Sequence, residues 1–264
     1  MPCLVYSTLD IASLNIAEAV KGRMDFEETK PVGGFRHFAS EHIDMIEMGS
    51  GLIDADFIDK TIRTDFIMFM SRHSSAKGIA TFTTHAEGNW SGEAEFGGRP
   101  KALSMASPVN MLSMLGAMEE VNTTEIPVMY EATHHGPLLD TPSFFVELGG
   151  NDETIKDKRY AEVVAESIVR MLHHEPGEYE KIAIGIGGTH YPEKFTKLAL
   201  EGKYAFAHMM PRYHIDNVDM LQKAIGRSDA EVEVAVIEWK SIKAADRDKI
   251  IGRLGELGLD YERV

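Results

Sequence analysis

Cysteine is nearly absent from this sequence, since Cys3 is the one cysteine among 264 residues. A single thiol cannot close a disulfide within the chain, and it cannot supply the thiolates of a cysteine-based zinc finger. Any metal site must therefore use histidine and carboxylate ligands. The scarcity of cysteine also fits a reducing cytoplasm.

Long apolar runs are missing as well. The longest, at residues 66–70, is far short of the roughly 20 apolar residues that a helix needs to cross a bilayer. The first twenty residues carry no basic start, and Asp10, Asn15 and Glu18 interrupt their apolar positions, so no export signal is predicted. We expect a cytoplasmic protein without a membrane span.

Positive charge is scarce, because 27 Lys and Arg face 42 Asp and Glu, for a net charge of −15. This net charge argues against a protein that binds nucleic acid over its whole surface, since binding phosphate backbones requires concentrated Lys and Arg. Two groups of basic residues remain candidates for a local patch: Arg72, Lys77, Arg99 and Lys101, and Lys194, Lys197 and Lys203. A solvated, charge-balancing surface is the alternative for both groups.

Apolar residues make up 44% of the chain, enough to bury a substantial core. Their spacing predicts strands at residues 3–6, 66–70, 79–83, 127–133, 144–148, 181–186, 203–209 and 232–237. Helical spacing is found at residues 8–20, 105–118, 154–173, 193–200, 216–225 and 244–257. This alternation predicts an α/β fold: a single three-layer domain over residues 1–264, with a mostly parallel, mixed sheet and helices on both faces.

Several of the eleven histidines follow predicted strands. In α/β sheets, ligands bind at loops that follow the carboxyl ends of strands. Four segments qualify: residues 72–75, 83–88, 131–136 and 187–190. Their convergence would form one polar pocket.

The adjacent residues His134 and His135 end one of these strands. If the strand continues through them, their side chains point to opposite faces, and Glu131, Thr133 and His135 share one side. His135 with Glu131 is then the better metal pair. His134 is left as an acid/base, or as a second ligand if the backbone has already turned. The alternative is one core histidine beside one exposed histidine.

A glycine turn follows the strand predicted in residues 181–190, at Gly187, Gly188 and Thr189. Backbone N–H groups in such turns can approach a phosphate or carboxylate. The turn lacks the Lys-Ser/Thr ending of a triphosphate loop, and His190 stands where a dinucleotide motif has its third glycine. Histidine at this position indicates chemistry rather than dinucleotide binding, with a purely structural turn as the alternative.

Glu147 lies inside an apolar strand. A buried acid is costly unless it meets a cation, a metal or several N–H donors. Glu147 is therefore a candidate general base or ligand, and a structural ion pair is the alternative. Nucleophilic catalysis has weaker support: no Gly-x-Ser-x-Gly motif is present, and the adjacency of Ser74 to His73 does not establish the required geometry.

Five segments, in this order, resemble the archaeal and plant type of D-aminoacyl-tRNA deacylase. They are residues 71–75 (SRHSS), 83–85 (TTH), 131–137 (EATHHGP), 145–149 (FVELG) and 185–191 (GIGGTHY). Their order and spacing cover most of the chain, so the resemblance is fairly specific.

This resemblance implies hydrolysis of the ester that joins a D-amino acid to the terminal ribose of tRNA. It also implies Zn²⁺ and a fold similar to purine nucleoside phosphorylases and peptidyl-tRNA hydrolases. The net charge of −15 conflicts with extensive tRNA binding, so we expect a monomer that grips little beyond the acceptor end.

On this hypothesis His135, His190 and Glu131 hold Zn²⁺, with His85 as a further ligand and one position open for water. Glu147 or His134 accepts the proton of that water. The amides of the glycine turn stabilise the oxyanion or hold a phosphate. The residues predicted to bind substrate are Arg72, His73, Ser74, Lys77, Gly187, Gly188, Thr189 and Tyr191.

Two other functions use the same residues. A zinc amidohydrolase or peptidase of small substrates would need the same ligands, and assays on N-acyl amino acids would identify it. A non-catalytic tRNA- or nucleotide-binding protein would instead have a closed four-ligand metal site and no turnover.

Overall fold

The computed structural model describes residues 1–73 and 78–264, so the predicted binding residues Ser74 and Lys77 lie outside the described residues. Its strands are β1 (Cys3–Ser7), β2 (Glu27–Glu28), β3 (Arg36–Ala39), β4 (Asp44–Met48), β5 (Ile67–His73), β6 (Thr81–His85), β7 (Gly88–Asn89), β8 (Ala102–Leu103), β9 (Val128–Tyr130), β10 (Ser143–Gly149), β11 (Lys181–Ile186), β12 (Tyr204–Met210), β13 (Val234–Ile237) and β14 (Tyr261–Arg263).

The α-helices are α1 (Ile11–Lys21), α2 (Pro108–Val121), α3 (Asp152–Lys156), α4 (Lys158–His173), α5 (Glu193–Leu200), α6 (Leu221–Gly226) and α7 (Ala244–Leu257). Short 3-10 helices are η1 (Leu52–Asp54), η2 (Ile58–Lys60), η3 (Arg212–Met220) and η4 (Trp239–Ser241). Among the described residues, no helix combines the length and the apolar character that crossing a membrane requires.

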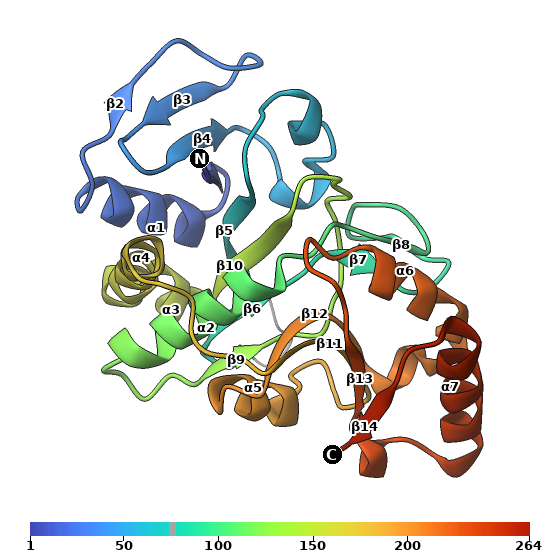
Figure 1. Cartoon of the computed structure of the whole chain (residues 1–264). Coiled ribbons are helices and arrows are strands. Elements are labelled where there is room, and N and C mark those ends of the chain that lie inside the picture. The colour runs from blue at the N-terminus through green and yellow to red at the C-terminus, as the bar shows by residue number, and fades with distance from the viewer. Residues whose placement is uncertain (74–77) are drawn as a thin grey trace.

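Most strands belong to one large sheet with the order β2-β3-β4-β1-β5-β10-β6-β9 (Figure 1). The pairs β4-β1, β1-β5, β5-β10 and β6-β9 are parallel, and the other three pairs are antiparallel. The expected α/β class with a mostly parallel, mixed sheet is therefore confirmed.

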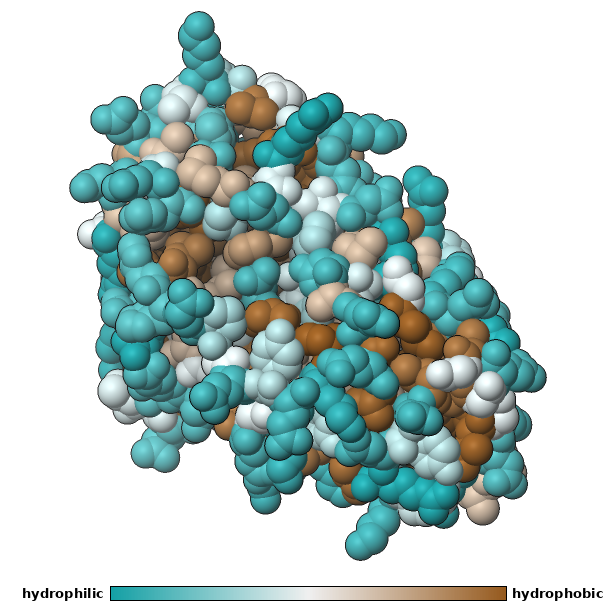
Figure 2. Space-filling view, in the orientation of Figure 1, coloured by the Kyte–Doolittle hydropathy of each residue, from teal (hydrophilic) through white to brown (hydrophobic). Residues whose placement is uncertain are grey.

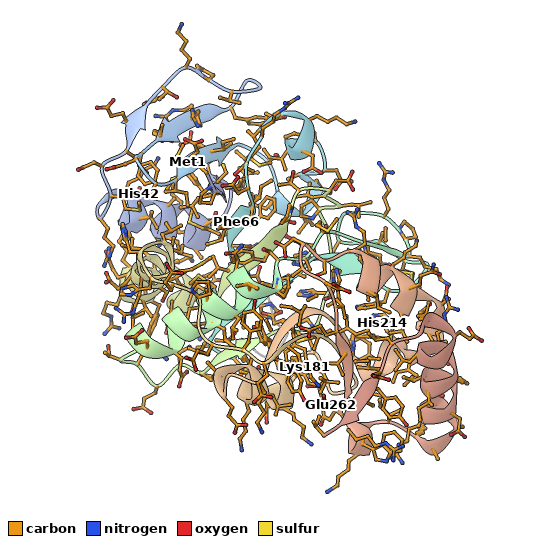
Figure 3. All side chains as sticks on the ribbon, in the orientation of Figure 1. Met1, His42, Phe66, Lys181, His214 and Glu262 are labelled. Carbon is orange, nitrogen blue, oxygen red and sulfur yellow. The ribbon has the colours of Figure 1, made fainter. Side chains whose placement is uncertain are left out.

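The C-terminal strands form a second sheet of order β12-β11-β13-β14, in which every pair is parallel. Lys181 of β11 and Glu262 of β14, labelled in Figure 3, form an ion pair across this sheet, with Lys181 Nζ 2.6 Å from Glu262 Oε1. Strand patterns in the sequence do not reveal this division, because they report strands and not their partners.

The large sheet is buried on both faces. Alternate residues of β1 and β5 belong to two apolar clusters: Leu4 and Met68 pack with α1, α2 and α4, whereas Val5 and Phe69 pack with η1 and η2. This explains the continuous apolar run at residues 66–70, since a strand covered on both faces has no solvent side. Figure 1 shows α1, α2 and α4 grouped over one face of this sheet.

Several element boundaries differ from the prediction. The helix expected at residues 154–173 is divided at Asp157, whose side chain accepts a hydrogen bond from Arg159 N and so caps α4. The strand expected at residues 127–133 ends at Tyr130. The short strands β2, β3, β4, β7, β8 and β14 were not predicted, because such short or mixed polar sequences carry no clear alternation.

Thr133 joins the two sheets just beyond β9. Its N–H donates to Met209 O at 3.0 Å, its Oγ1 accepts from Met209 N at 3.1 Å, and Oγ1 lies 3.2 Å from His208 Nδ1. Its carbonyl accepts from Trp90 Nε1 at 2.9 Å. The segment that follows β9 is thus held by β12 of the second sheet.

We predict that Thr133→Val lowers the free energy of unfolding by about 1–3 kcal/mol, because Met209 N–H and His208 lose a buried partner. Chemical denaturation of this variant and of Thr123→Val, at an exposed position, provides the measurement. A loss no larger than that of the control would contradict the proposed link.

Candidate active site

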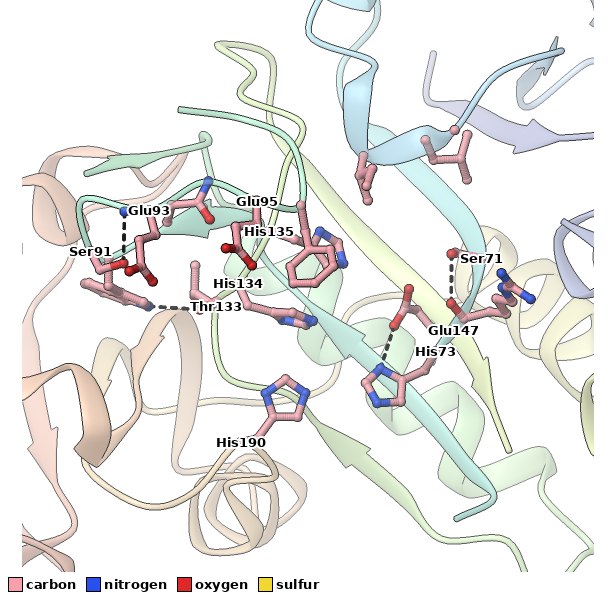
Figure 4. A pocket seen from close by; sticks show the side chains of 18 of the residues that line it. Ser71, His73, Ser91, Glu93, Glu95, Thr133, His134, His135, Glu147 and His190 are labelled. Carbon is pink, nitrogen blue, oxygen red and sulfur yellow. Dashed lines mark hydrogen bonds and ion pairs between the residues drawn. The ribbon is translucent and has the colours of Figure 1, made fainter. Parts of the chain in front are cut away.

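A cavity of about 920 Å³ opens where the two sheets meet. It is lined by the ends of β5 and β10, by the loops that follow β7 and β9, by the turn after β11, and by η3. Figure 4 shows His73 and Glu147 on one side, Glu93 and Glu95 on the other, and the remaining labelled histidines between them. The loops that carry the histidines meet at this cavity, as the sequence predicts.

Glu131 is fully buried beside this cavity. Its Oε2 accepts from His190 Nε2 at 2.8 Å and from His73 Nδ1 at 3.0 Å, and it lies 3.6 Å from His134 Nε2. Burial acts to raise the pKa of Glu131, but the hydrogen bonds from His190 and His73 outweigh it and hold the pKa well below its usual range. Glu131 is therefore a carboxylate anion at neutral pH.

His73 connects Glu131 to a second buried carboxylate, Glu147, whose Oε2 is 3.3 Å from His73 Nδ1. Burial acts to lower the pKa of His73, but Glu131 and Glu147 together raise it to about 10. The other ring nitrogen of His73 lies 2.7 Å from the hydroxyl of Tyr191. His73 is thus an imidazolium held between two acids.

Three other histidines share one hydrogen-bonding pattern. The Nδ1 atoms of His85, His134 and His135 donate to the main-chain carbonyls of Ala86, Ala132 and Gly136, at 3.1, 2.9 and 2.6 Å. A carbonyl accepts only from an N–H, so each Nε2 atom carries a lone pair in the neutral ring. This tautomer is the one that metal-binding histidines use.

The charge state of these rings follows from burial and from the nearby acids. Burial and neighbouring histidines lower the pKa of His134 well below its usual range and that of His135 to about 4. Burial opposes protonation of His85, but Glu147 and Glu131 outweigh it and raise the pKa of His85. Two buried anions therefore favour a cation at this point, whether a proton or a metal ion.

The strand predicted at residues 127–133 does not continue through His134 and His135, so the alternative of a backbone that has already turned applies. The strand ends at Tyr130, and His135 has a left-handed φ of 42°. Gly88 N donates to the carbonyls of both histidines, at 3.2 and 2.7 Å, which fixes the turn. Both rings consequently line the cavity.

The glycine turn after β11 is tightly packed. A Cβ on Gly187, where φ is 111°, would lie 2.7 Å from Ser241 Oγ, and one on Gly188 would lie 2.6 Å from Glu238 Oε2. The Gly187 and Gly188 amides donate to Met210 O and Ser241 Oγ, at 2.8 Å each. Both N–H groups are occupied, so the turn positions the histidine that follows it rather than offering these amides to a ligand.

The remaining predicted binding residues divide in two. Arg72 and Tyr191 line the cavity with His73. Thr189 is exposed, and its Oγ1 donates to Tyr191 O at 2.8 Å.

Within the described part of the chain, three overlapping groups of residues could hold a metal ion. They are His73, Glu131, His134 and His190; His85, His134 and His135; and His85, Glu131 and Glu147. The four predicted ligands do not form one group, since His190 and Glu131 join the first and His135 joins the second. His85, Glu131 and His134 each belong to two of the three groups, which makes the groups one continuous cluster.

Several residues of the cavity were not predicted from the sequence. Glu93, Glu95, Phe96 and Tyr213 line the cavity, but they lie in segments without strand or histidine patterns. His208, by contrast, is buried away from it, with Nε2 2.9 Å from Arg227 O, so its role is structural.

The fold and the site together define an α/β protein with a buried histidine–carboxylate centre suited to activating water, as hydrolases do. A family model described as D-aminoacyl-tRNA deacylase matches residues 60–262, and this chain belongs to that family. The resemblance drawn from the five motifs is confirmed.

Relatives and a solved structure agree with this assignment. The chain is 37% identical to the D-aminoacyl-tRNA deacylase of Pyrococcus furiosus, over 99% of each chain. It is 36% identical to that of Archaeoglobus fulgidus, over 97% of this chain and 94% of the relative. The crystal structure of a conserved protein of unknown function, 34% identical, superposes with a TM-score of 0.92 over 100% of this chain and 95% of that one.

Proposed function

We propose that this protein hydrolyses the ester bond of D-aminoacyl-tRNA and releases the free D-amino acid and tRNA. The observation that carries the proposal is the pair of buried carboxylates, Glu131 and Glu147, surrounded by histidines beside an open cavity. Family membership supports the substrate. The result would be removal of wrongly attached D-amino acids and recovery of the tRNA.

The donor set fits a zinc ion. Buried His85 Nε2 has no hydrogen-bond partner in the described structure, and buried Glu131 Oε1 has none either. We propose that His85, His134 and His135 hold Zn²⁺ through their Nε2 atoms, with Glu131 and His190 adjacent. Zinc bound there would polarise the ester carbonyl and lower the pKa of a coordinated water towards about 7.

The proton transfers fall to Glu147 and His73, which both line the cavity. Burial acts to raise the pKa of Glu147, but the hydrogen bond from His73 and the nearby positive charge of His85 lower it, so this carboxylate is ionised and can accept the proton of the attacking water. His73, with a pKa of about 10, is charged and can donate a proton to the departing ribose oxygen. His134 is neutral, which suits a ligand better than an acid.

Selection of the D enantiomer is assigned to the shape of the cavity. An L side chain would collide with the wall at the point where the D enantiomer presents only hydrogen, and a steric clash is an effective filter. The protein would grip the acceptor end alone, because its net charge of −15 opposes wider contact with tRNA.

Three broader proposals follow. One large apolar cluster includes residues of both sheets, which supports a single domain over residues 1–264. We also propose that the protein acts as a monomer. We also propose that the protein acts in the cytoplasm, because its proposed substrate is a tRNA.

Hydrolysis of D- and L-tyrosyl-tRNA by the purified protein, with and without chelator, tests the function directly. We expect faster loss of the D ester, inhibition by chelator and recovery on adding Zn²⁺. Equal rates on both enantiomers would refute proofreading. Turnover of N-acyl amino acids in place of the esters would indicate an amidohydrolase, and turnover of neither substrate a binding protein.

Glu147→Gln should lower kcat on D-tyrosyl-tRNA by at least about 100-fold, because the amide has the same shape but cannot accept a proton. Single-turnover rates measure the effect, and a thermal melt confirms folding. The matched control is Glu153→Gln, at an exposed position on α3. Activity of Glu147→Gln within a few-fold of wild type would exclude Glu147 as the base.

His135→Ala should leave the purified protein with much less than the wild-type amount of zinc, because the metal loses one of three imidazole ligands. Atomic absorption after gel filtration measures zinc per chain independently of activity. His42→Ala replaces an exposed histidine outside the groups that could hold a metal ion and serves as control. Equal zinc in all three proteins would contradict the ligand assignment.

A further inference from the structure

Three large apolar side chains stand exposed around the mouth of the active-site cavity. Leu9 is 72% exposed, Phe96 is 65% exposed and Tyr213 is 57% exposed, and all three line the cavity. Single exposed apolar residues are ordinary. Several around one functional opening, two of them aromatic, indicate a contact surface for a ligand.

The two aromatic residues are attached to the loops that carry His135 and His190. Phe96 O accepts from Gly136 N at 2.9 Å, one residue beyond His135. At the start of η3, Arg212 N donates to Gly188 O at 3.1 Å, in the turn that leads to His190. The backbone that carries each ring is therefore tied to a loop of the active site.

The hydroxyl of Tyr213 also feels the charge of the active-site residue Glu131. Burial, and then the negative charge of Glu131, raise the pKa of its hydroxyl. Its ring lies 4.8 Å from that of His214, which also lines the cavity and is labelled in Figure 3. A flat ligand at the mouth would meet this pair on one side and Phe96 from another segment.

We propose that Phe96 and Tyr213 form a stacking site for the unpaired terminal base of the acylated RNA strand, an inference that rests on the proposed function. The scissile ester is on the ribose of that base, so a base must lie within one nucleotide of the catalytic groups. Unpaired bases stack on aromatic side chains, whatever their sequence.

Two arginines near the aromatic residues offer positive charge to an RNA strand: Arg72 lines the cavity, and Arg212 directly precedes Tyr213 in the chain. Arg72 and Arg212 are exposed, and among residues 1–73 and 78–264 neither guanidinium group makes a hydrogen bond or ion pair. They are available to phosphates leading to the base. Glu93 and Glu95 lie across the cavity from Ser71 (Figure 4), next to Phe96 in the chain, and they do not repel an uncharged base.

Most of the surface in Figure 2 is hydrophilic, in keeping with the acidic composition. Binding of tRNA by broad electrostatic contact is therefore disfavoured. Stacking, which does not require net positive charge, provides affinity that this surface otherwise lacks.

The test combines Phe96→Ala with Tyr213→Ala and uses two substrates that share the same small amino acid. D-alanyl-tRNA carries the terminal base, and D-alanine methyl ester does not. We expect the ratio of kcat/KM for the tRNA to that for the methyl ester to fall roughly 5- to 100-fold, mainly through KM on the tRNA. Because the amino acid of both substrates is alanine, no aromatic side chain of the substrate can occupy the stacking site in place of the base.

Two controls separate stacking from other effects. Phe96→Tyr with Tyr213→Phe keeps both rings and should keep the wild-type ratio. Tyr179→Ala removes an exposed aromatic residue that does not line the cavity and should also keep it. An unchanged ratio in the double alanine variant, or an equal loss on both substrates, would overturn the proposal.

A binding measurement distinguishes this inference from the proposed function. The probe is a CCA trinucleotide carrying D-alanine through a stable 3′-amide, and calorimetry gives its dissociation constant without turnover. Weaker binding by the double alanine variant supports the stacking site even if the wild-type protein hydrolyses no ester. Equal binding by both proteins refutes the site even if the deacylase activity is established.

Discussion

Two buried carboxylates that share one histidine partner determine the electrostatics of the whole site. An ionised Glu131 or Glu147 loses its hydration on burial, and such a loss costs several kcal/mol unless a cation compensates it. His73 supplies that cation between them, as its pKa of about 10 records. His85, His134 and His135 are arranged around this pair, with their Nδ1 atoms bonded to main-chain carbonyls. A centre of this kind attracts cations, which is why the same geometry serves proton transfer and metal binding.

The constraint explains why the protein needs two sheets. Glu147 and His73 come from adjacent parallel strands of the large sheet, whereas His190 follows a strand of the second sheet. Ala132 N donates to His190 O at 2.8 Å, directly beside Glu131. The segment after β9 therefore leaves its own sheet and joins the other one. This junction is where His190 meets Glu131.

The cavity then has two parts with different requirements. Its floor holds charged groups in a desolvated setting, where each proton or metal ion has a strong effect. Its mouth presents aromatic and apolar surface to solvent, at a cost that only a ligand recovers. An acidic protein can bind one end of a polyanion in this way, because contact is confined to a few residues.

The sequence by itself determined the α/β class, most of the helices and strands, and the set of loops that form the site. It also excluded a disulfide within the chain and showed no apolar run long enough to cross a bilayer. These follow from local periodicity and composition, which depend on near neighbours in the chain. The five motifs also determined the family. Strands of mixed polarity, such as β3, escaped detection, since their pairing rather than their pattern makes them strands.

Tertiary structure decided the rest. Whether His134 and His135 face one cavity or opposite sides depended on Gly88, more than 40 residues away, whose amide bonds to both carbonyls. The grouping of histidines depended on how the second sheet meets the first, and the glycine turn proved to be occupied by Ser241 and Met210. A local stretch of sequence cannot predict these features, because the charge, tautomer and direction of a side chain depend on atoms that only folding brings near.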